Sequence, residues 1–191
     1  MPPKCKFTKQ EIIQAALQIA RTEGPDGITA RGLGARLGAS SRPIFSVFAN
    51  MEAVQAEVMQ SAKELYSQYV QAGLSQTPAF RGVGQQYIQV AIDEPKLFQM
   101  LFMSEQPQTP GIAAVLPVIE THYEAILASV QTEYHLARSV AERLYRHLWI
   151  YTHGIAALCA THTCAFTSEG IQTLLTEVFT SLLRTLKGEP T

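Results

Sequence analysis

No run of about 18 or more apolar residues passes uninterrupted through this chain, so no segment has the length of a membrane-spanning helix. The first residues also lack the apolar core and small-residue cleavage site of a secretory signal. Cysteine is scarce, and Cys5, Cys159 and Cys164 are an odd number without the spacing of a disulfide framework. Such usage is typical of a reducing compartment. We therefore expect a cytoplasmic protein with no membrane partner.

Motifs of the common enzyme classes are absent as well. The sequence contains no glycine-rich phosphate loop, no His-Glu-x-x-His pair, no serine nucleophile turn and no carboxylate pair with an evident partner. Cys159, His162 and Cys164 do not have a standard zinc spacing, because a helix would bring only the first two together. We expect a protein that is not an enzyme and that uses neither a metal nor a cofactor.

Charged residues make up only 16% of the chain, and the net charge is −1. That sum conceals an uneven distribution. Through Asn50 the sequence has seven basic and three acidic residues, a net charge of +4, which leaves −5 for the remainder. A basic end joined to an acidic body is typical of a protein that binds a polyanion such as nucleic acid at one end.

Apolar residues recur at helical spacing through most of the chain, and nothing alternates in the manner of a strand. The pattern predicts an all-α protein of about nine helices. The first begins after Thr8, with Glu11 completing a capping box, and ends at Gly24. Asn50 caps a longer helix that runs to Gly73. Later helices are expected over 78–92, from Pro95, over 111–130, over 136–161 and after a Ser168 cap.

The segment from Thr29 to Phe48 has the plan of a helix-turn-helix unit. Thr29 can cap a short helix that ends in a turn at Gly38, and Ser40 can cap a third helix that runs to Phe48. In such a unit the helix after the turn enters the major groove of DNA, and the helix before the turn lies across the phosphates. The expected DNA contacts are Lys6, Thr29, Arg31, Ser40, Ser41, Arg42, Phe45, Ser46 and Asn50.

These residues also have a purely structural interpretation, because Thr29, Gly38 and Ser40 are explained as two caps and a turn. The basic end favours DNA binding over a subdomain that only packs. We expect residues 1–50 to form the DNA-binding domain. Residues 51–191 would form a second domain, with a connecting helix over 51–73.

The stretch from Phe7 to Val58 combines an alanine-rich first helix, a Leu-Gly turn, an aromatic pair and an Asn-x-Glu helix start, formed by Ala15, Ala16, Gly24, Thr29, Leu37, Gly38, Ser40, Phe45, Phe48, Asn50 and Glu52. With this combination the stretch resembles the DNA-binding domain of the tetracycline-repressor (TetR) family. The sequence departs from the family pattern at Phe45, Val47 and Met51, where Tyr, His and Lys are common. Each departure removes a polar group of the kind that such regulators turn towards the DNA backbone. The resemblance implies a transcriptional regulator that binds double-stranded operator DNA.

A second stretch, with Trp149, His153 and Gly154, resembles the Trp-His-Gly type of C-terminal domain found in part of that family. This resemblance implies a small-molecule effector and a homodimer formed mainly by the last two helices. The effector candidates are Tyr87, Phe98, Met100, Leu101, Met103, Tyr123, Trp149 and His153. They would suit a largely apolar ligand, and ordinary core packing is the alternative for each of them.

The final helix has an apolar stripe too wide for a helix that faces solvent. The dimerisation candidates on it are Leu174, Leu175, Val178 and Leu182.

The expected function is that of a repressor released from a palindromic operator by a small, largely apolar effector. The alternative is a helical ligand-binding or interaction protein of the same fold whose DNA binding is weakened or lost.

Overall fold

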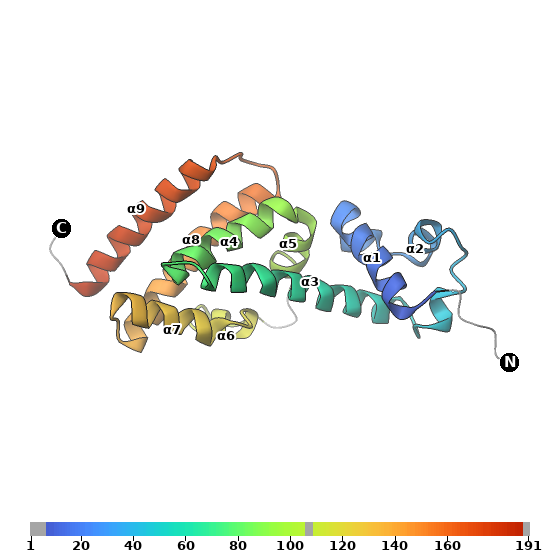
Figure 1. Cartoon of the computed structure of the whole chain (residues 1–191), viewed down its shortest axis with the longest axis horizontal. Coiled ribbons are helices and arrows are strands. Elements are labelled where there is room, and N and C mark those ends of the chain that lie inside the picture. The colour runs from blue at the N-terminus through green and yellow to red at the C-terminus, as the bar shows by residue number, and fades with distance from the viewer. Residues whose placement is uncertain (1–6, 106–108, 189–191) are drawn as a thin grey trace. The chain divides into compact units, whose positions relative to one another are not determined.

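The computed structural model describes residues 7–105 and 109–188, so the predicted DNA contact Lys6 lies outside the described residues. Within these ranges the chain is all-helical and has no strand, which confirms the prediction of an all-α fold with about nine helices (Figure 1). The α-helices are α1 (Lys9–Glu23), α2 (Ala30–Arg36), α3 (Met51–Leu74), α4 (Ala79–Asp93), α5 (Pro95–Phe102), α6 (Val115–Ile119), α7 (Tyr123–Tyr134), α8 (Arg138–Ala160) and α9 (Ser168–Lys187). Two short 3-10 helices are η1 (Pro25–Gly27) and η2 (Ile44–Ser46). None of the helices in the described ranges combines the length and the apolar character needed to cross a membrane.

The chain divides into two compact units, and the division differs from the predicted boundary at residue 50. Unit 1 comprises residues 1–65 and 94–104, and unit 2 comprises residues 66–93 and 105–191. The first half of α3 belongs to unit 1 because its buried Val54, Val58 and Ala62 join the apolar cluster that contains α1. Leu97 and Met100 bring α5 into the same cluster. The predicted boundary at residue 50 followed the helix-turn-helix motif, so it left out these residues from later in the chain.

The start of α1 has the predicted capping box. The Thr8 hydroxyl accepts a hydrogen bond from the Glu11 amide at 3.2 Å, and the Glu11 carboxylate accepts one from the Thr8 amide at 2.8 Å. The helix ends at Gly24, whose φ of +84° favours glycine. Its buried face carries Ile12 and Ala16, which are fully buried. The sequence therefore specified both ends of this helix through local interactions.

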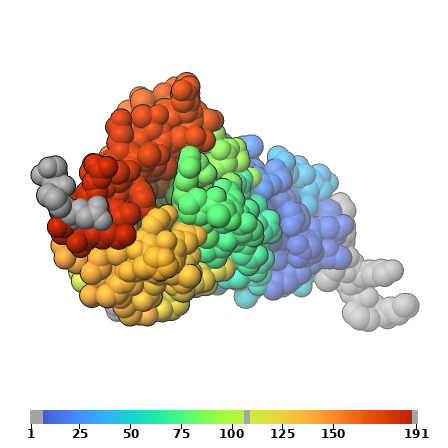
Figure 2. All heavy atoms as spheres, turned by 60° about the vertical axis from the view of Figure 1, so that its left-hand side comes forward, coloured from blue at the N-terminus to red at the C-terminus, as the bar shows by residue number. Residues whose placement is uncertain are grey.

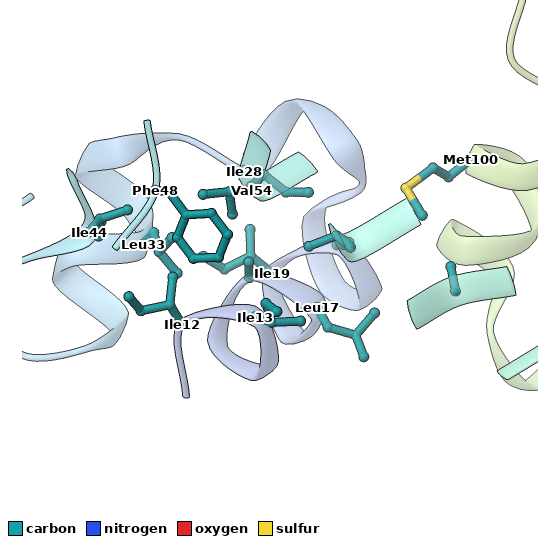
Figure 3. Packing of buried hydrophobic residues seen from close by; sticks show 14 of the residues in the cluster. Ile12, Ile13, Leu17, Ile19, Ile28, Leu33, Ile44, Phe48, Val54 and Met100 are labelled. Atoms are coloured by element: carbon teal, nitrogen blue, oxygen red, sulfur yellow. The ribbon is translucent and has the colours of Figure 1, made fainter. Parts of the chain in front are cut away.

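Phe48 lies at the centre of the core of unit 1. Its ring points into the cluster among Ile12, Leu33 and Val54, with Ile44 beside it (Figure 3). Because a fully buried aromatic ring removes a large apolar area from water, these contacts anchor the segment that follows α2. The turn before that segment contains Gly38 with φ of +63°, as expected for the left-handed end of a helix.

The third helix of the predicted helix-turn-helix is shorter than expected. Instead of a helix from Ser40 to Phe48, only the 3-10 helix η2 forms, within a series of bends and turns. The Ile44 amide donates to the Ser41 carbonyl and the Ser46 amide to the Pro43 carbonyl, each three residues back. The Ser46 hydroxyl also donates to the Pro43 carbonyl at 2.6 Å. These bonds form a tight 3-10 turn in place of a continuous α-helical ladder. The described residues still contain nine α-helices, because the expected helix over 111–130 forms as two.

The helix expected over 111–130 is interrupted at Glu120, where α6 ends and the backbone turns before α7. Its carboxylate accepts a hydrogen bond from the His122 amide at 2.9 Å instead of continuing the helix. Pro117 accounts for the late start of α6, since proline is tolerated in the first turn of a helix but not further along. The predicted Ser168 cap of α9 was wrong by one residue. Thr167 caps the helix, and its hydroxyl accepts a hydrogen bond from the Gly170 amide at 3.0 Å.

In unit 2 the long helix α8 packs against α4, α7 and α9, and α4 also packs against α7 (Figure 1). Where α3 and α4 meet, the backbone of Gly82 approaches that of Gly73 closely. A Cβ atom on Gly82 would lie only 2.4 Å from the Gly73 carbonyl oxygen, so glycine is required at this contact. This arrangement leaves a cavity between α4, α8 and α9.

Candidate functional site

Unit 2 contains a cavity of about 320 Å³, formed by α3, α4, α8 and α9 with contributions from the C-terminal ends of α6 and α7. Figure 2 views this unit from the side that carries α9, in red, and α7, in yellow-orange. Cavities of roughly 300 to 1,000 Å³ are typical of small-molecule sites. The aromatic residues that line it are Tyr66, Phe80, Tyr87, Tyr134, Tyr145, Trp149 and Phe179.

Three of the predicted effector residues come together at this cavity. The Tyr87 hydroxyl lies 2.9 Å from His153 Nδ1, and the Trp149 and His153 rings are 5.5 Å apart between centroids. The Trp149 indole also forms a hydrogen bond with the Tyr87 hydroxyl. Because an indole nitrogen only donates, Tyr87 accepts there and can donate to His153. Tyr87 and Trp149 line the cavity, and His153 contacts it through Tyr87.

Burial sets the protonation states of this network. Burial lowers the pKa of His153, because the charged imidazolium is poorly solvated there. It also raises the pKa of Tyr87, against the opposing effect of the hydrogen bond from Trp149. His153 is therefore favoured as the neutral imidazole, whose Nδ1 accepts a hydrogen bond from the Tyr87 hydroxyl. The network is uncharged near neutral pH.

Glu120 is an acidic residue of the site that sequence reasoning missed. It lines the cavity, and only 7% of its surface is exposed. One carboxylate oxygen accepts a hydrogen bond from the Tyr66 hydroxyl at 2.5 Å, and the other accepts one from the His122 amide at 2.9 Å. Its signal in the sequence is a lone acidic residue directly after the apolar run from Val115 to Ile119. That position resembles a helix end, which conceals its function.

The other predicted effector residues do not line this cavity. Tyr123 stacks on Tyr145, with ring centroids 5.7 Å apart, and only Tyr145 reaches the cavity. Four others belong to unit 1. Phe98 is fully buried there, Met100 is part of the unit 1 core with Leu101 packed against it, and Met103 is 43% exposed. The apolar face of α5 packs against α1. Aromatic and methionine content alone did not distinguish this core from a binding site.

The predicted dimerisation residues on α9 divide between two environments. Leu175 lines the cavity, whereas Leu174, Val178 and Leu182 are half-buried on the helix. The neighbouring helix α8 exposes two large apolar side chains, Ile150 at 47% and Leu158 at 39%. One side of α9 therefore serves the cavity, and apolar surface remains on both α8 and α9.

In unit 1 the predicted DNA-contact residues are mostly exposed, and several have structural partners. The Thr29 hydroxyl accepts from the Gly32 amide at 3.1 Å, and Asn50 accepts from the Ala53 amide at 2.9 Å. Arg31 and Arg42 are exposed, and neither forms an ion pair within the part of the chain that the structure describes. The remaining exposed candidates are Ser40, Phe45 and Ser46, while Ser41 is half-buried.

Two departures from the family pattern have a structural explanation. Val47 and Met51 are half-buried and pack against the apolar core of unit 1. Here the apolar residues contribute packing where a polar group would have remained in solvent. No family model matches the sequence, and no curated protein matches it either.

Proposed function

We propose that this protein is a DNA-binding transcriptional regulator that acts as a homodimer and responds to a small molecule. The observation that carries the proposal is the pair Arg31 and Arg42, on either side of the turn at Gly38, which are exposed and form no ion pair with any acidic residue that the structure describes. Buried Leu33 and Ile44 hold the two flanking segments to one core. Guanidinium groups carried by anchored segments and open to solvent are suited to phosphate oxygens.

The shortened third helix affects how the DNA is read. A three-residue 3-10 turn presents fewer side chains to a major groove than the nine-residue helix expected from sequence. Phe45 and Ser46 are its exposed side chains, and Arg42 is exposed just before it. We propose that affinity comes mainly from phosphate contacts and that only a few bases are read directly.

A homodimer would place two such segments on one operator. Two half-sites separated by about 34 Å, one turn of the duplex, require a two-fold axis in the protein. The apolar surface of α8 and α9, with Ile150 and Leu158 exposed, is suited to a self-complementary contact. We place the dimer interface there.

The cavity would hold the effector. A ligand that binds better to a form of the dimer unable to match the operator shifts the population towards that form and releases the DNA. Thermodynamic linkage then requires that operator DNA weaken effector binding by the same factor.

The test begins with selection from a random duplex library by the purified full-length protein in dilute salt. We expect an inverted repeat to be enriched and to bind in fluorescence anisotropy titrations. Arg31→Ala and Arg42→Ala should each weaken binding and reduce the salt slope by about one. Lys63→Ala, an exposed residue of α3, is the matched control and should bind like the wild type. Failure to bind any duplex in dilute buffer would refute the proposal.

One observation favours a second function, that of a ligand-binding helical protein without DNA binding. The 3-10 turn is short, and Phe45 on it is 47% exposed, so the surface expected to enter the groove is small and partly apolar. The same selection distinguishes the two functions. A protein that binds small molecules in the cavity but retains no duplex would be of the second kind.

A further inference from the structure

We propose that the cavity of unit 2 binds an organic cation, a ligand with an ammonium group on an apolar body. Glu120 would be its counter-ion, and the surrounding tyrosine and tryptophan rings would be its walls. The inference deepens the proposed function only in identifying this ligand as the effector. Cation binding itself is tested without DNA, so the two proposals can fail independently.

The Glu120 carboxylate has no counter-charge in its surroundings among the residues that the structure describes. It is nine-tenths buried and faces the cavity, and both of its hydrogen-bond donors, the Tyr66 hydroxyl and the His122 amide, are neutral. Within the described ranges no Lys, Arg or His nitrogen forms an ion pair with it. A carboxylate offers about four acceptor positions, so two remain. Burying a charge without a counter-charge is costly, and a bound cation would supply that counter-charge.

Aromatic rings form much of the cavity wall. Tyr66 and Tyr87 meet edge to face, with centroids 6.1 Å apart, and Phe80 and Tyr145 do the same at 5.6 Å. Burial, followed by the negative charge of Glu120, raises the pKa of both Tyr66 and Tyr145. The field of one carboxylate therefore reaches rings from two helices. Aromatic faces attract cations, and they do so more strongly where contact with water is reduced.

The charges around the cavity favour a positive ligand. Arg81 is the one basic residue among the described residues that line it, and its side chain is exposed and within 3.5 Å of Gln172. Solvent screens an exposed guanidinium, whereas the field of a buried carboxylate is screened much less. The interior therefore attracts a positive charge. Glu120 is the one acidic residue among the described residues that line the cavity, and one carboxylate balances one positive charge, so the ligand class is a monocation.

The experiment uses Trp149, the only tryptophan in the chain, as a reporter in the cavity wall. Its fluorescence is followed during titration with phenyltrimethylammonium and with tert-butylbenzene, a neutral compound of nearly the same shape. We expect the wild-type protein to bind the cation at least tenfold more tightly than the neutral compound. Equal affinities, tighter binding of tert-butylbenzene or no binding of either compound would overturn the proposal.

Glu120→Gln separates charge from shape, because glutamine keeps an oxygen that can accept from the Tyr66 hydroxyl. We expect cation affinity to fall at least tenfold and tert-butylbenzene affinity to stay the same or rise. Glu169→Gln removes a charge at the exposed start of α9 and should change neither affinity. An unchanged cation affinity in folded Glu120→Gln would overturn the proposal. If circular dichroism shows that this variant is unfolded, the comparison of the two compounds on the wild-type protein decides.

Discussion

The hydroxyl of Tyr87 on α4 lies 2.9 Å from Nδ1 of His153 on α8. The contact joins two helices through residues that are 66 positions apart in sequence. Trp149, one turn before His153, also hydrogen-bonds to this hydroxyl. The side of α8 that carries Trp149 and His153 therefore fixes one wall of the cavity. His153 positions Tyr87, and Tyr87 lines the space where a ligand would bind.

His153 makes the stability of the protein depend on pH. Burial lowers its pKa in the folded protein below the ordinary value of about 6.5 that the unfolded chain retains. The unfolded chain therefore binds more protons between the two values. We expect the free energy of unfolding to be at its full value above about pH 6.5 and to fall as the pH drops towards the folded pKa. Urea denaturation at pH 7.5 and 5.5 measures the difference.

The variant His153→Gln should lose part of this pH dependence. His147→Gln changes an exposed histidine of the same helix and should retain the wild-type dependence. A His153→Gln protein that loses as much stability as the wild type between the two pH values would show that other groups are responsible.

Gly82→Ala should destabilise unit 2. The new methyl group would meet the Gly73 carbonyl at 2.4 Å, and a backbone atom cannot move away without displacing its helix. Overpacking of this kind costs about 1 to 3 kcal/mol. Gly84→Ala, in the same helix with open space around the position, is the control and should be neutral or stabilising by up to about 1 kcal/mol. Equal urea midpoints for the two variants would contradict the close contact.

The ion pair between Arg21 and Glu94 should stabilise unit 1. Two nitrogens of Arg21 meet the two oxygens of Glu94 at 3.0 and 2.9 Å, and both side chains are less than one-third exposed. Glu94→Gln should lower the free energy of unfolding by about 1 kcal/mol, since bidentate, partly buried pairs exceed the small contribution of exposed pairs.

The exposed pair of Lys9 and Glu57 is the comparison for that prediction. Glu57→Gln should change the free energy of unfolding by less than about 0.5 kcal/mol, because solvent screens both charges. Thermal or urea unfolding of both variants provides the values. A larger effect from Glu57→Gln than from Glu94→Gln would reverse our ranking of the two pairs.

Ile150→Glu should disrupt the proposed dimer, because it places a charge within the apolar surface of α8, where Ile150 is 47% exposed. Sedimentation equilibrium should show a dimer for the wild type and a monomer for this variant. Ile112→Glu changes a side chain that is 59% exposed and lies outside α8 and α9, so it should remain dimeric. A wild-type protein that is monomeric at tens of micromolar would contradict the proposed interface.

By itself, the sequence determined the features that depend on neighbours along the chain. The capping box of Thr8 and Glu11, the Thr29 and Asn50 caps and the turn at Gly38 were all predicted, because each involves residues no more than a few positions apart. Tyr87, Trp149 and His153 were predicted from composition and resemblance, and the structure places them in contact.

Only the tertiary structure decided which apolar residues surround a space and which fill a core. Phe98 and Met100 have the same chemical character as the cavity wall, but they are buried in unit 1 because α5 packs against α1. The burial of Glu120 likewise depends on Tyr66, 54 residues earlier in the chain. Hydrophobic burial is non-directional, so its pattern along the sequence shows that a residue is inside without showing what lies opposite it.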